Sequence, residues 1–536
     1  MRASRGLVCL VMLSLFLLHC CRGGSSDRES ASDPPPYSPN PAPTPNPTEG
    51  PVSGELLPEI VAGDAHTCLL TNKREVFCWG DNFYGQLGSG QPNAVGLQST
   101  DLDNLSPVDL GSNTKAMSLF AGPYHNCIIT QAGAVKCWGI NSSGQLGNGS
   151  AEDRGNQPHQ MGDSLPETRL PPGAKAVHLD LGSNHSCAVL DSGNVVCWGS
   201  DIVHKPSGAI GPGILGRGNA APGDGVIGNE PGEMGANLVP VDLGQEFFVV
   251  QVAVTEAAAC ALSKSGLVKC WGNNHMAHLG RDSTTPTRVG DSPALMGDRL
   301  PVVDLGTIHS RALKAKSIYG NESHVCVVTE LDESKCWGLS MVGVYGLGSY
   351  FRNDQSYDDV AGLIGDGLKT TGGNMTQREM GDHLRASDWG FSRKISVLGL
   401  SGFRICGILD GGNAVRCHGV NRKFQSSPGG GLGIGRHGVG DDRGTMDFPE
   451  ENQGCYPRNT GVNGLDVLIP WSLRHASAKV IGVATSEGDH TCLVFSNMKY
   501  FCFGDNTYGA AGTGPASSGL TVESMQNIPV RTIPGN

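Results

Sequence analysis

Short apolar stretches alternate with polar turns along most of this chain. Residues 66–71 read HTCLLT, a polar turn follows, and residues 75–80 read EVFCWG. The corresponding turns further along are DSG at 191–193, KSG at 264–266 and DGG at 410–412. Apolar runs joined by short glycine-containing turns are typical of β-hairpins.

Each predicted hairpin carries a pair of cysteines. Six pairs are spaced by ten residues and one by eleven: Cys68 with Cys78, Cys127 with Cys137, Cys187 with Cys197, Cys260 with Cys270, Cys326 with Cys336, Cys406 with Cys417, and Cys492 with Cys502. Because the first turn centres near residue 73, we expect Cys68 and Cys78 to face each other across the hairpin. Directly opposed residues of a non-hydrogen-bonded pair lie about 4.5 Å apart, within the reach of a disulfide. The alternative is reduced, buried cysteines acting as small hydrophobes. Seven matched pairs favour disulfides, and this spacing does not build a zinc site.

The hairpins belong to one repeated phrase. It reads GDAHTCLLTNKREVFCWGDNFYGQLG at 63–88 and returns at 122–147 and from residue 182. Self-similarity at such a period predicts a propeller or a solenoid. A tryptophan follows the second cysteine in five units, and we expect it to pack blades together: Trp79, Trp138, Trp198, Trp271 and Trp337. The last two units have His418 and Phe503 instead, but keep the following glycine, which indicates a backbone requirement.

A histidine recurs two positions before the first cysteine. It is present in five units as His66, His125, His185, His324 and His490. The fourth unit has Ala258 and the sixth has Arg404. Because one position per blade spreads these residues around a ring, we expect structural histidines satisfied by hydrogen bonds, in place of a catalytic or metal-binding group.

Further motifs complete the phrase and point to a family. They are GQLG (144–147), GILG (213–216), AHLG (277–280), GAAG (509–512), PVDLG (107–111, 240–244), PVVDLG (301–306) and MGD (161–163, 296–298, 380–382). The phrase resembles the regulator-of-chromosome-condensation repeat over most of residues 58–536. The resemblance implies an all-β, seven-bladed β-propeller, and the cysteines independently count seven units, with one intrablade hairpin disulfide per blade. It also implies protein binding on a propeller face, because the family includes exchange factors for a small GTPase, ubiquitin-ligase domains and secreted β-lactamase inhibitors.

The N-terminal residues predict export. Arg2 and Arg5 precede the apolar run Leu7–Leu18, as in a signal peptide, which we assign to residues 1–21. The cysteines that follow resemble a lipoprotein box, and we expect lipidation at Cys21, with Cys20 as the less suitable position. Simple secretion is the alternative. Residues 22–57 form a Ser/Pro-rich tether, and residues 58–536 form the propeller. Export agrees with paired cysteines, so we expect an extracytoplasmic protein, either secreted or anchored to a membrane by lipid alone.

Composition narrows the functional classes. The formal charge is −12, and the sequence has no Lys/Arg-rich patch, which argues against a nucleic-acid partner. No catalytic motif is present, so we expect no enzyme activity, no cofactor and no metal. We expect a monomer. Cys455 has no partner in the pattern and is read as a free thiol, an intermolecular link or a buried cysteine.

Two long insertions, 349–391 and 425–475, follow the CWG-type strands and are expected on one face of the propeller. Their aromatic residues are candidate partner-binding positions: Tyr350, Phe351, Tyr357, Trp389, Phe391, Phe448, Tyr456 and Trp471. The alternative is that these aromatics pack each loop onto its own blade. The sequence therefore predicts an exported propeller that binds a protein or peptide. A carbohydrate-binding propeller and an exchange-factor-like regulator of a small GTPase are the alternatives.

Overall fold

The fold was analysed in a computed structural model. It describes residues 57–98, 100–205, 208–219, 223–281, 288–341, 361–364, 380–390, 392–402, 404–419, 478–486, 490–504, 506, 508–511 and 531–533. These residues all fall within one unit of the chain. Within them, no helix has the length and apolar character needed to cross a membrane.

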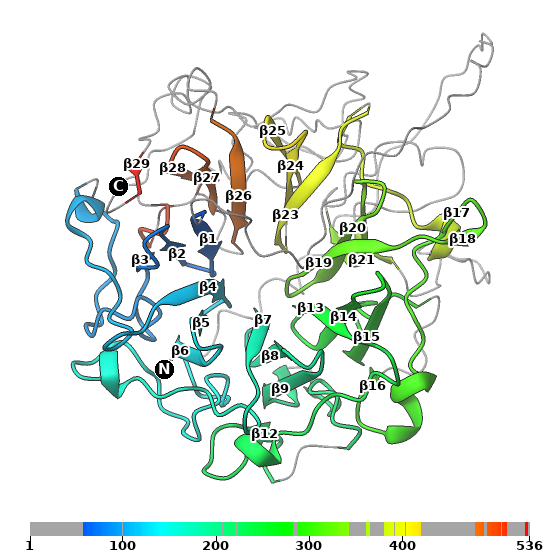
Figure 1. The fold of residues 1–536 in the computed structure, drawn as a ribbon, viewed down its shortest axis with the longest axis horizontal. Coiled ribbons are helices and arrows are strands. Elements are labelled where there is room, and N and C mark those ends of the chain that lie inside the picture. Colours follow the sequence, from blue (N-terminus) through cyan, green and yellow to red (C-terminus); the bar gives the residue numbers. More distant parts are fainter. Residues whose placement is uncertain are drawn as a thin grey trace, which may run out of the picture. The chain divides into compact units, whose positions relative to one another are not determined.

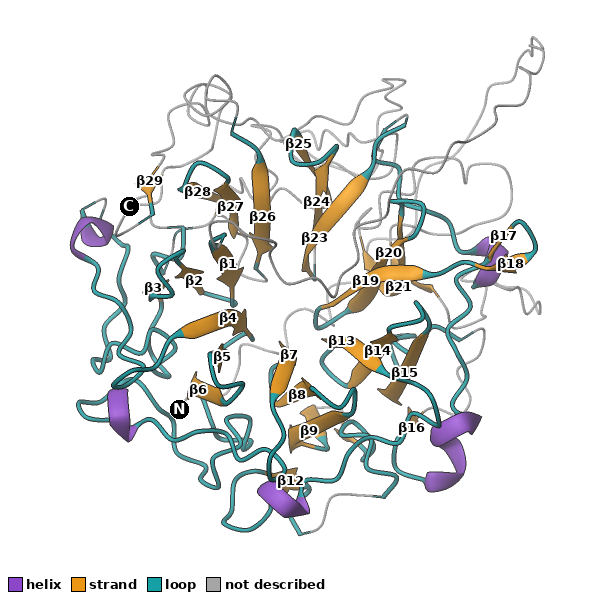
Figure 2. Ribbon diagram, in the orientation of Figure 1, coloured by secondary structure: helices purple, strands orange, loops and turns teal. Residues whose placement is uncertain are grey.

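Seven antiparallel sheets of three or four strands make up the described part of the chain (Figures 1 and 2). The first two sheets contain β1 (Glu59–Ala62), β2 (His66–Leu70), β3 (Val76–Gly80), and β4 (Ala116–Ala121), β5 (His125–Thr130), β6 (Val135–Gly139). The third and fourth contain β7 (Ala176–Leu181), β8 (His185–Leu190), β9 (Val195–Ser200), β12 (Val226–Ile227), and β13 (Val249–Val254), β14 (Ala258–Ser263), β15 (Val268–Asn273), β16 (Arg288–Val289). The fifth and sixth contain β19 (Ala315–Gly320), β20 (His324–Thr329), β21 (Ser334–Met341), β22 (Ala361–Ile364), and β23 (Ile395–Ser401), β24 (Arg404–Leu409), β25 (Ala414–Gly419). The seventh contains β26 (Val480–Thr485), β27 (His490–Phe495), β28 (Lys499–Gly504) and β29 (Arg531–Thr532).

Smaller elements join these sheets. Two short hairpins pair β10 (Val203–Lys205) with β11 (Gly208–Ile210), and β17 (Thr307–Ile308) with β18 (Arg311–Ala312). The short 3-10 helices are η2 (Asp101–Asn104), η3 (Gly162–Ser164), η4 (Gly235–Asn237), η5 (Pro293–Leu295), η6 (Gly297–Arg299) and η7 (Gly381–His383).

The cysteine pairs link the second and third strands in each of the seven sheets. Cys68 lies directly opposite Cys78 in the β2–β3 ladder. The same opposition recurs in the other six hairpins, between Cys127 and Cys137, Cys187 and Cys197, Cys260 and Cys270, Cys326 and Cys336, Cys406 and Cys417, and Cys492 and Cys502. All seven pairs form disulfides, with Cα atoms 4.0–4.1 Å apart. The predicted opposition across the turn is therefore present in each hairpin.

The sheets close into a ring through their first strands. Contacts run from β1 to β4, β7, β13, β19, β23 and β26, and β26 contacts β1 again. Figure 1 shows these strands around a common centre. Because neighbouring sheets cover both faces of each hairpin, every residue of β2 and β3 is buried. The fold is an all-β propeller, as the sequence predicted.

The tryptophan and GQLG motifs join each sheet to the one before it. Trp138 Nε1 donates a hydrogen bond to the Gln86 carbonyl oxygen at 3.0 Å, and Trp198 Nε1 donates to the Gln145 carbonyl at 2.8 Å. Trp271 and Trp337 repeat this bond to Ile214 and His278. The series closes the ring, because Trp79 Nε1 donates to the carbonyl of Ala510 in the seventh unit at 2.9 Å.

The PVDLG and MGD motifs link successive connections between sheets. Gly162 N donates to the Asp109 carbonyl at 2.9 Å, and Gly297 N donates to the Asp242 carbonyl at the same distance. A buried lysine holds the same loop from inside: Lys136 Nζ donates to the Leu110 carbonyl at 2.8 Å. Lys269 and Lys335 do the same in their units. These two sequence signatures therefore serve assembly of the ring.

The glycine after the tryptophan position has a steric role. Gly80 has φ +115°, and a Cβ atom there would lie 2.4 Å from the Ala65 carbonyl oxygen. Gly419 and Gly504, which follow His418 and Phe503, have φ values of +109° and +111°. L-residues with side chains rarely adopt this conformation, so the predicted backbone requirement is confirmed.

Candidate functional site

The turns between the first and second strands of each sheet converge on the ring axis. They surround a cavity of about 90 Å³, which is lined by residues of all seven units. We call this place the mouth and define it by Asp64, Asp180, Thr255, Glu322 and Ser486, with Tyr124 and Ser183 beside them. The mouth therefore combines side chains that are distant in sequence.

Asp64 and Glu322 give the mouth its acidic character. Asp64 accepts a hydrogen bond from the Tyr124 hydroxyl, and Glu322 accepts one from Ser183 Oγ. Burial, reinforced by the charge of Glu322, raises the pKa of Asp64 to about 7. Burial and the neighbouring Asp64 also raise the pKa of the Tyr124 phenol. A positively charged group placed here would be attracted to both carboxyl groups.

Asp180, a residue of the mouth, links the first strands of two adjacent sheets. Its Oδ2 accepts a hydrogen bond from Val254 N of the next sheet at 2.7 Å. Burial raises its pKa to about 7, although the amide hydrogen bonds oppose this shift. Glu59 and Gln251 make similar bonds to the next sheet, to Leu119 N and Ile318 N, both at 3.0 Å. These side chains thus position adjacent first strands.

Aromatic side chains extend the mouth outward. The Tyr84 and Tyr124 ring centroids lie 5.7 Å apart, and Phe83 stacks edge-on against Tyr84 at 4.8 Å. Phe83 is 60% exposed, and Tyr508, at the equivalent turn of the seventh unit, is 45% exposed. Large exposed aromatics next to hydrogen-bonding groups are typical anchors of protein interfaces.

The recurring histidines serve the ring instead of the mouth. His66 Nε2 lies 3.1 Å from Asn126 Oδ1, His125 Nε2 lies 3.1 Å from Ser186 Oγ, and His490 Nε2 lies 2.8 Å from Thr67 Oγ1. Each contact crosses to the next sheet. Burial lowers the pKa of His66 to about 4 and that of His125 to about 3, so both are neutral at physiological pH.

Of the eight predicted aromatic positions, the structure describes Trp389. Its side chain is 4% exposed, and Nε1 donates to Ser334 Oγ at 2.8 Å. The ring lies 4.3 Å from that of His418. Trp389 therefore packs between the fifth and sixth sheets. Seven positions lie outside the described residues and stay predictions: Tyr350, Phe351, Tyr357, Phe391, Phe448, Tyr456 and Trp471. The same holds for Cys20, Cys21 and Cys455.

The mouth residues were not singled out from the sequence. Asp64, Ser183 and Glu322 fall between the repeated glycine-type start of the phrase and its histidine, where each unit has different residues. Variable positions inside an otherwise repeated phrase were the available signal. Their convergence depends on ring closure, which no single unit reveals.

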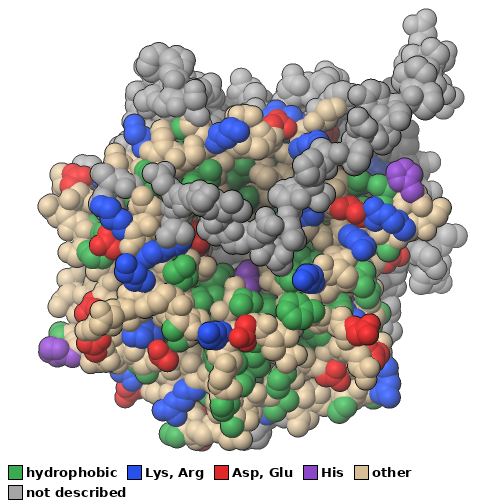
Figure 3. All heavy atoms as spheres, in the orientation of Figure 1, with side chains coloured by type: hydrophobic (Ala, Val, Ile, Leu, Met, Phe, Trp, Pro, Cys, Tyr) green, Lys and Arg blue, Asp and Glu red, His purple; other side chains and the backbone are tan. Residues whose placement is uncertain are grey.

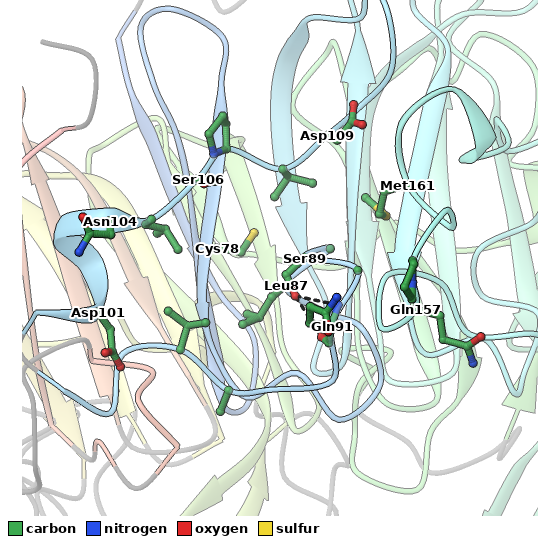
Figure 4. A pocket seen from close by; sticks show the side chains of 18 of the residues that line it. Cys78, Leu87, Ser89, Gln91, Asp101, Asn104, Ser106, Asp109, Gln157 and Met161 are labelled. Atoms are coloured by element: carbon green, nitrogen blue, oxygen red, sulfur yellow. Dashed lines mark hydrogen bonds between the residues drawn. The ribbon is translucent and has the colours of Figure 1, made fainter.

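A second hollow lies beside the outer edge of β3 (Figure 4). Its volume is about 870 Å³, and it is lined by Leu87 of the GQLG turn of the first unit and by Ser89 and Gln91, which follow that turn. Its acidic side chains hold the surrounding loops: Asp101 Oδ2 accepts Gly96 N at 3.0 Å, and Asp109 Oδ1 accepts Gly111 N at 3.0 Å. The mouth is the better candidate, because it combines exposed aromatics with carboxyl groups from several units.

No group of three or more His, Cys, Asp or Glu side chains suited to a metal ion occurs within the described ranges.

Sequence comparison assigns the repeats. Residues 59–86, 118–145 and 176–201 match one model of the regulator of chromosome condensation (RCC1) repeat, and residues 75–129 match a second. RCC1 repeats are thus detected in the first three units of the chain. The matched segments contain the first three disulfide hairpins, including β2–β3, β5–β6 and β8–β9.

Similar proteins include members with different roles. The mouse probable E3 ubiquitin-protein ligase HERC4 is 32% identical over 142 residues, covering 26% of this chain and 12% of that protein. The Saccharomyces cerevisiae guanine nucleotide exchange factor SRM1 is 24% identical over 305 residues, covering 53% of this chain and 56% of that protein. The RCC1-repeat chain thus matches less than two thirds of the length of these relatives.

Solved structures agree on the fold. Yeast RCC1 (Prp20) in its complex with Kap60 matches with a TM-score of 0.54 and 18% identity, covering 90% of both chains. The structure of Prp20p from Saccharomyces cerevisiae matches with a TM-score of 0.52 and 19% identity, covering 86% of both. At this identity the likeness supports the propeller fold of the RCC1-repeat chain alone.

Proposed function

We propose that this RCC1-repeat protein is an exported propeller, held near a surface by its N-terminal region, that binds a protein partner at the mouth. The observation that carries the proposal is the mouth itself. There, Asp64 and Glu322 from two units meet beside the aromatic series Tyr124, Tyr84 and Phe83. Its role is binding, with no reaction catalysed.

Export is supported by the disulfides and by the N-terminal sequence. Structural disulfides persist in oxidising compartments and are rare in the cytosol. Seven hairpin disulfides, together with the apolar run Leu7–Leu18 and the cysteines at 20 and 21, favour an extracytoplasmic protein with a lipid anchor.

Protein binding is supported by the proteins with similar folds. Yeast RCC1 was solved bound to Kap60, and the Prp20p structure is described together with its binding to Gsp1p and histones. A shared propeller does not transfer these partners, but it makes a protein partner the best-supported class.

A regulator of a small GTPase is the second candidate. It is favoured by the match to SRM1, an exchange factor, over 53% of this chain. Release of a fluorescent guanine nucleotide from a small GTPase tests it directly. Exchange activity that survives only with reduced cysteines would favour this role over the exported one.

The main proposal is tested by using the full chain to capture binding partners from the extracytoplasmic compartment. Variants Phe83→Ala and Asp64→Asn/Glu322→Gln remove the aromatic and acidic parts of the mouth, and deletion of 349–391 and 425–475 removes the insertions. Interface hot spots contribute about 2 kcal/mol or more, so we expect at least about 30-fold weaker binding of a true partner by the mouth variants. Undiminished binding of every partner by all variants would contradict the proposal.

A further inference from the structure

A lysine directly precedes the first strand in five units. These residues are Lys115, Lys175, Lys314, Lys394 and Lys479, and all are exposed. We call them the lysine ring. The fourth unit has Phe248 at this position, and its side chain is 47% exposed. Because the first strands surround one axis and have the same place in every sheet, their starts lie on one face, opposite the mouth.

Only the aliphatic part of this lysine side chain packs against the neighbouring hairpin turn. A Cβ atom on Gly133, in the hairpin turn of the preceding unit, would lie 2.6 Å from the Lys175 Cβ atom. The Lys314 stem covers Gly266 in the same way. Phe248 fills the equivalent place over Gly193 with its ring. An apolar side chain therefore fills this position equally well. The packing does not require the five ammonium groups.

These ammonium groups are in excess over local acids. Three turn carboxylates already have other partners: Glu330 pairs with Arg311 at 2.6 Å, Asp332 with Lys316 at 2.5 Å, and Asp410 with Arg393 at 2.6 Å. A fourth, Asp191, accepts a hydrogen bond from the backbone nitrogen of Lys175 at 3.3 Å. Lys394 lies 3.8 Å from the shared Asp332. Within the described part of the chain, the ammonium groups of Lys115, Lys175, Lys314 and Lys479 have no carboxylate within 4.0 Å.

Exposed apolar side chains lie inside the lysine ring. Met117 is 39% exposed and Val177 is 53% exposed, and both stand two residues after a ring lysine. Figure 3 looks onto this face and shows hydrophobic side chains near its centre with Lys and Arg around them. Leu57, which lies two residues before β1 and thus at the start of a first strand, is 52% exposed.

We propose that the lysine ring docks the propeller onto an anionic membrane surface, so that the mouth points away from the membrane. The inference deepens the proposed function and rests on its surface tether. Basic side chains near an anionic bilayer each contribute binding energy, and apolar side chains between them enter the interface. Because β1, like the other first strands, begins on the lysine-ring face, a membrane anchor N-terminal to β1 would favour this orientation.

The net charge of −12 does not oppose this orientation. Charges separated by more than a Debye length, about 8 Å at physiological salt, are largely screened from each other. The carboxyl groups of the mouth lie at the other end of the first strands. The membrane therefore interacts mainly with the lysine-ring face.

Sedimentation with vesicles tests the proposal on the chain that begins at residue 22, which carries neither the apolar leader nor an acyl group. We expect binding to vesicles of phosphatidylglycerol and phosphatidylcholine, weaker binding at high salt, and none to pure phosphatidylcholine. The variant Lys115→Gln/Lys175→Gln/Lys314→Gln/Lys479→Gln should bind several hundred-fold more weakly, because each lysine contributes about fivefold.

Matched controls separate charge from structure. The same four positions changed to Arg should keep binding, and Arg288→Gln, on β16 outside the lysine ring, should have little effect. Equal binding by the Gln variant and its parent, or binding that ignores phosphatidylglycerol, overturns the proposal. Binding to polyglutamate but not to vesicles also overturns the membrane proposal. It would show that the lysine ring binds an acidic polymer instead. Mouth variants should bind vesicles normally, so failure of the partner proposal remains distinguishable.

Discussion

At the residue scale, burial between sheets determines protonation. The ring histidines are neutral because burial disfavours the imidazolium, while burial favours the protonated form of Asp64 and Asp180. These two effects act on stability in opposite directions. Depressed histidine pKa values reduce stability as pH falls below about 6.5, and raised carboxyl pKa values reduce it as pH rises from about 4 to 7.

Asp180→Asn isolates the carboxyl effect. The native Asp180 holds its proton up to a pKa of about 7, whereas the unfolded chain releases it near pH 4. Its contribution is therefore complete at low pH and is lost as pH rises through 7. The melting temperature of the variant, relative to the parent, should be higher at pH 8 than at pH 4.5. Asp191→Asn, at an exposed turn, is the control, and a pH-independent difference for Asp180→Asn would contradict the assignment.

At the element scale, the hairpin is the repeated unit and the motif contacts join one unit to the next. A disulfide that closes so short a loop contributes roughly 2–3 kcal/mol at most. The remaining stability comes from burial and from bonds such as Trp198 Nε1 to the Gln145 carbonyl. This division explains why the tryptophan and GQLG motifs recur together.

Replacing Trp198 tests the inter-sheet bond. Trp198→Phe removes the Nε1 donor but keeps an aromatic ring, as Phe503 does naturally at the equivalent position, so we expect a loss of about 1–2 kcal/mol. Trp198→Ala also creates a cavity and should cost about 3–5 kcal/mol. Urea denaturation of both variants measures these values. Equal losses in the free energy of unfolding for Trp198→Phe and Trp198→Ala would contradict the separate contributions assigned here to the hydrogen bond and to packing of the ring.

The hairpins, and the packing of the recurring tryptophan between blades, were predictable from the sequence, but the partners of the contacts between sheets were not. The distance of Cys68 and Cys78 from their turn was sufficient to predict their opposition, because a hairpin is a local structure. The bond from Trp138 to Gln86 joins residues 52 positions apart in different units, and no single unit shows it. The mouth escaped prediction for the same reason, since Asp64 and Glu322 meet only after the ring closes.

At the scale of the whole molecule, the two ends of the described chain complete the ring together. Trp79, near the N-terminal end, packs with Tyr500 and Ile533, near the C-terminal end. The Arg531 guanidinium forms an ion pair with Asp103 at 2.7 Å. The short strand β29 adds to the edge of β28. The first and seventh sheets therefore depend on each other.

A chain that ends at residue 530 should be less stable as a whole. It loses β29, the Arg531–Asp103 ion pair and Ile533, which is 1% exposed. Burial of one isoleucine alone contributes about 1.5–3 kcal/mol. Thermal unfolding should show a lower melting temperature than that of a control chain ending at Ile533. An unchanged transition would contradict the role assigned to this closure.

Peptide mass spectrometry of the native protein, without a reducing agent, tests the central claim that seven oxidised hairpins build this ring. The structure predicts seven disulfides, each joining the two cysteines of one hairpin. Free thiols at these positions, or bonds between different hairpins, would contradict it.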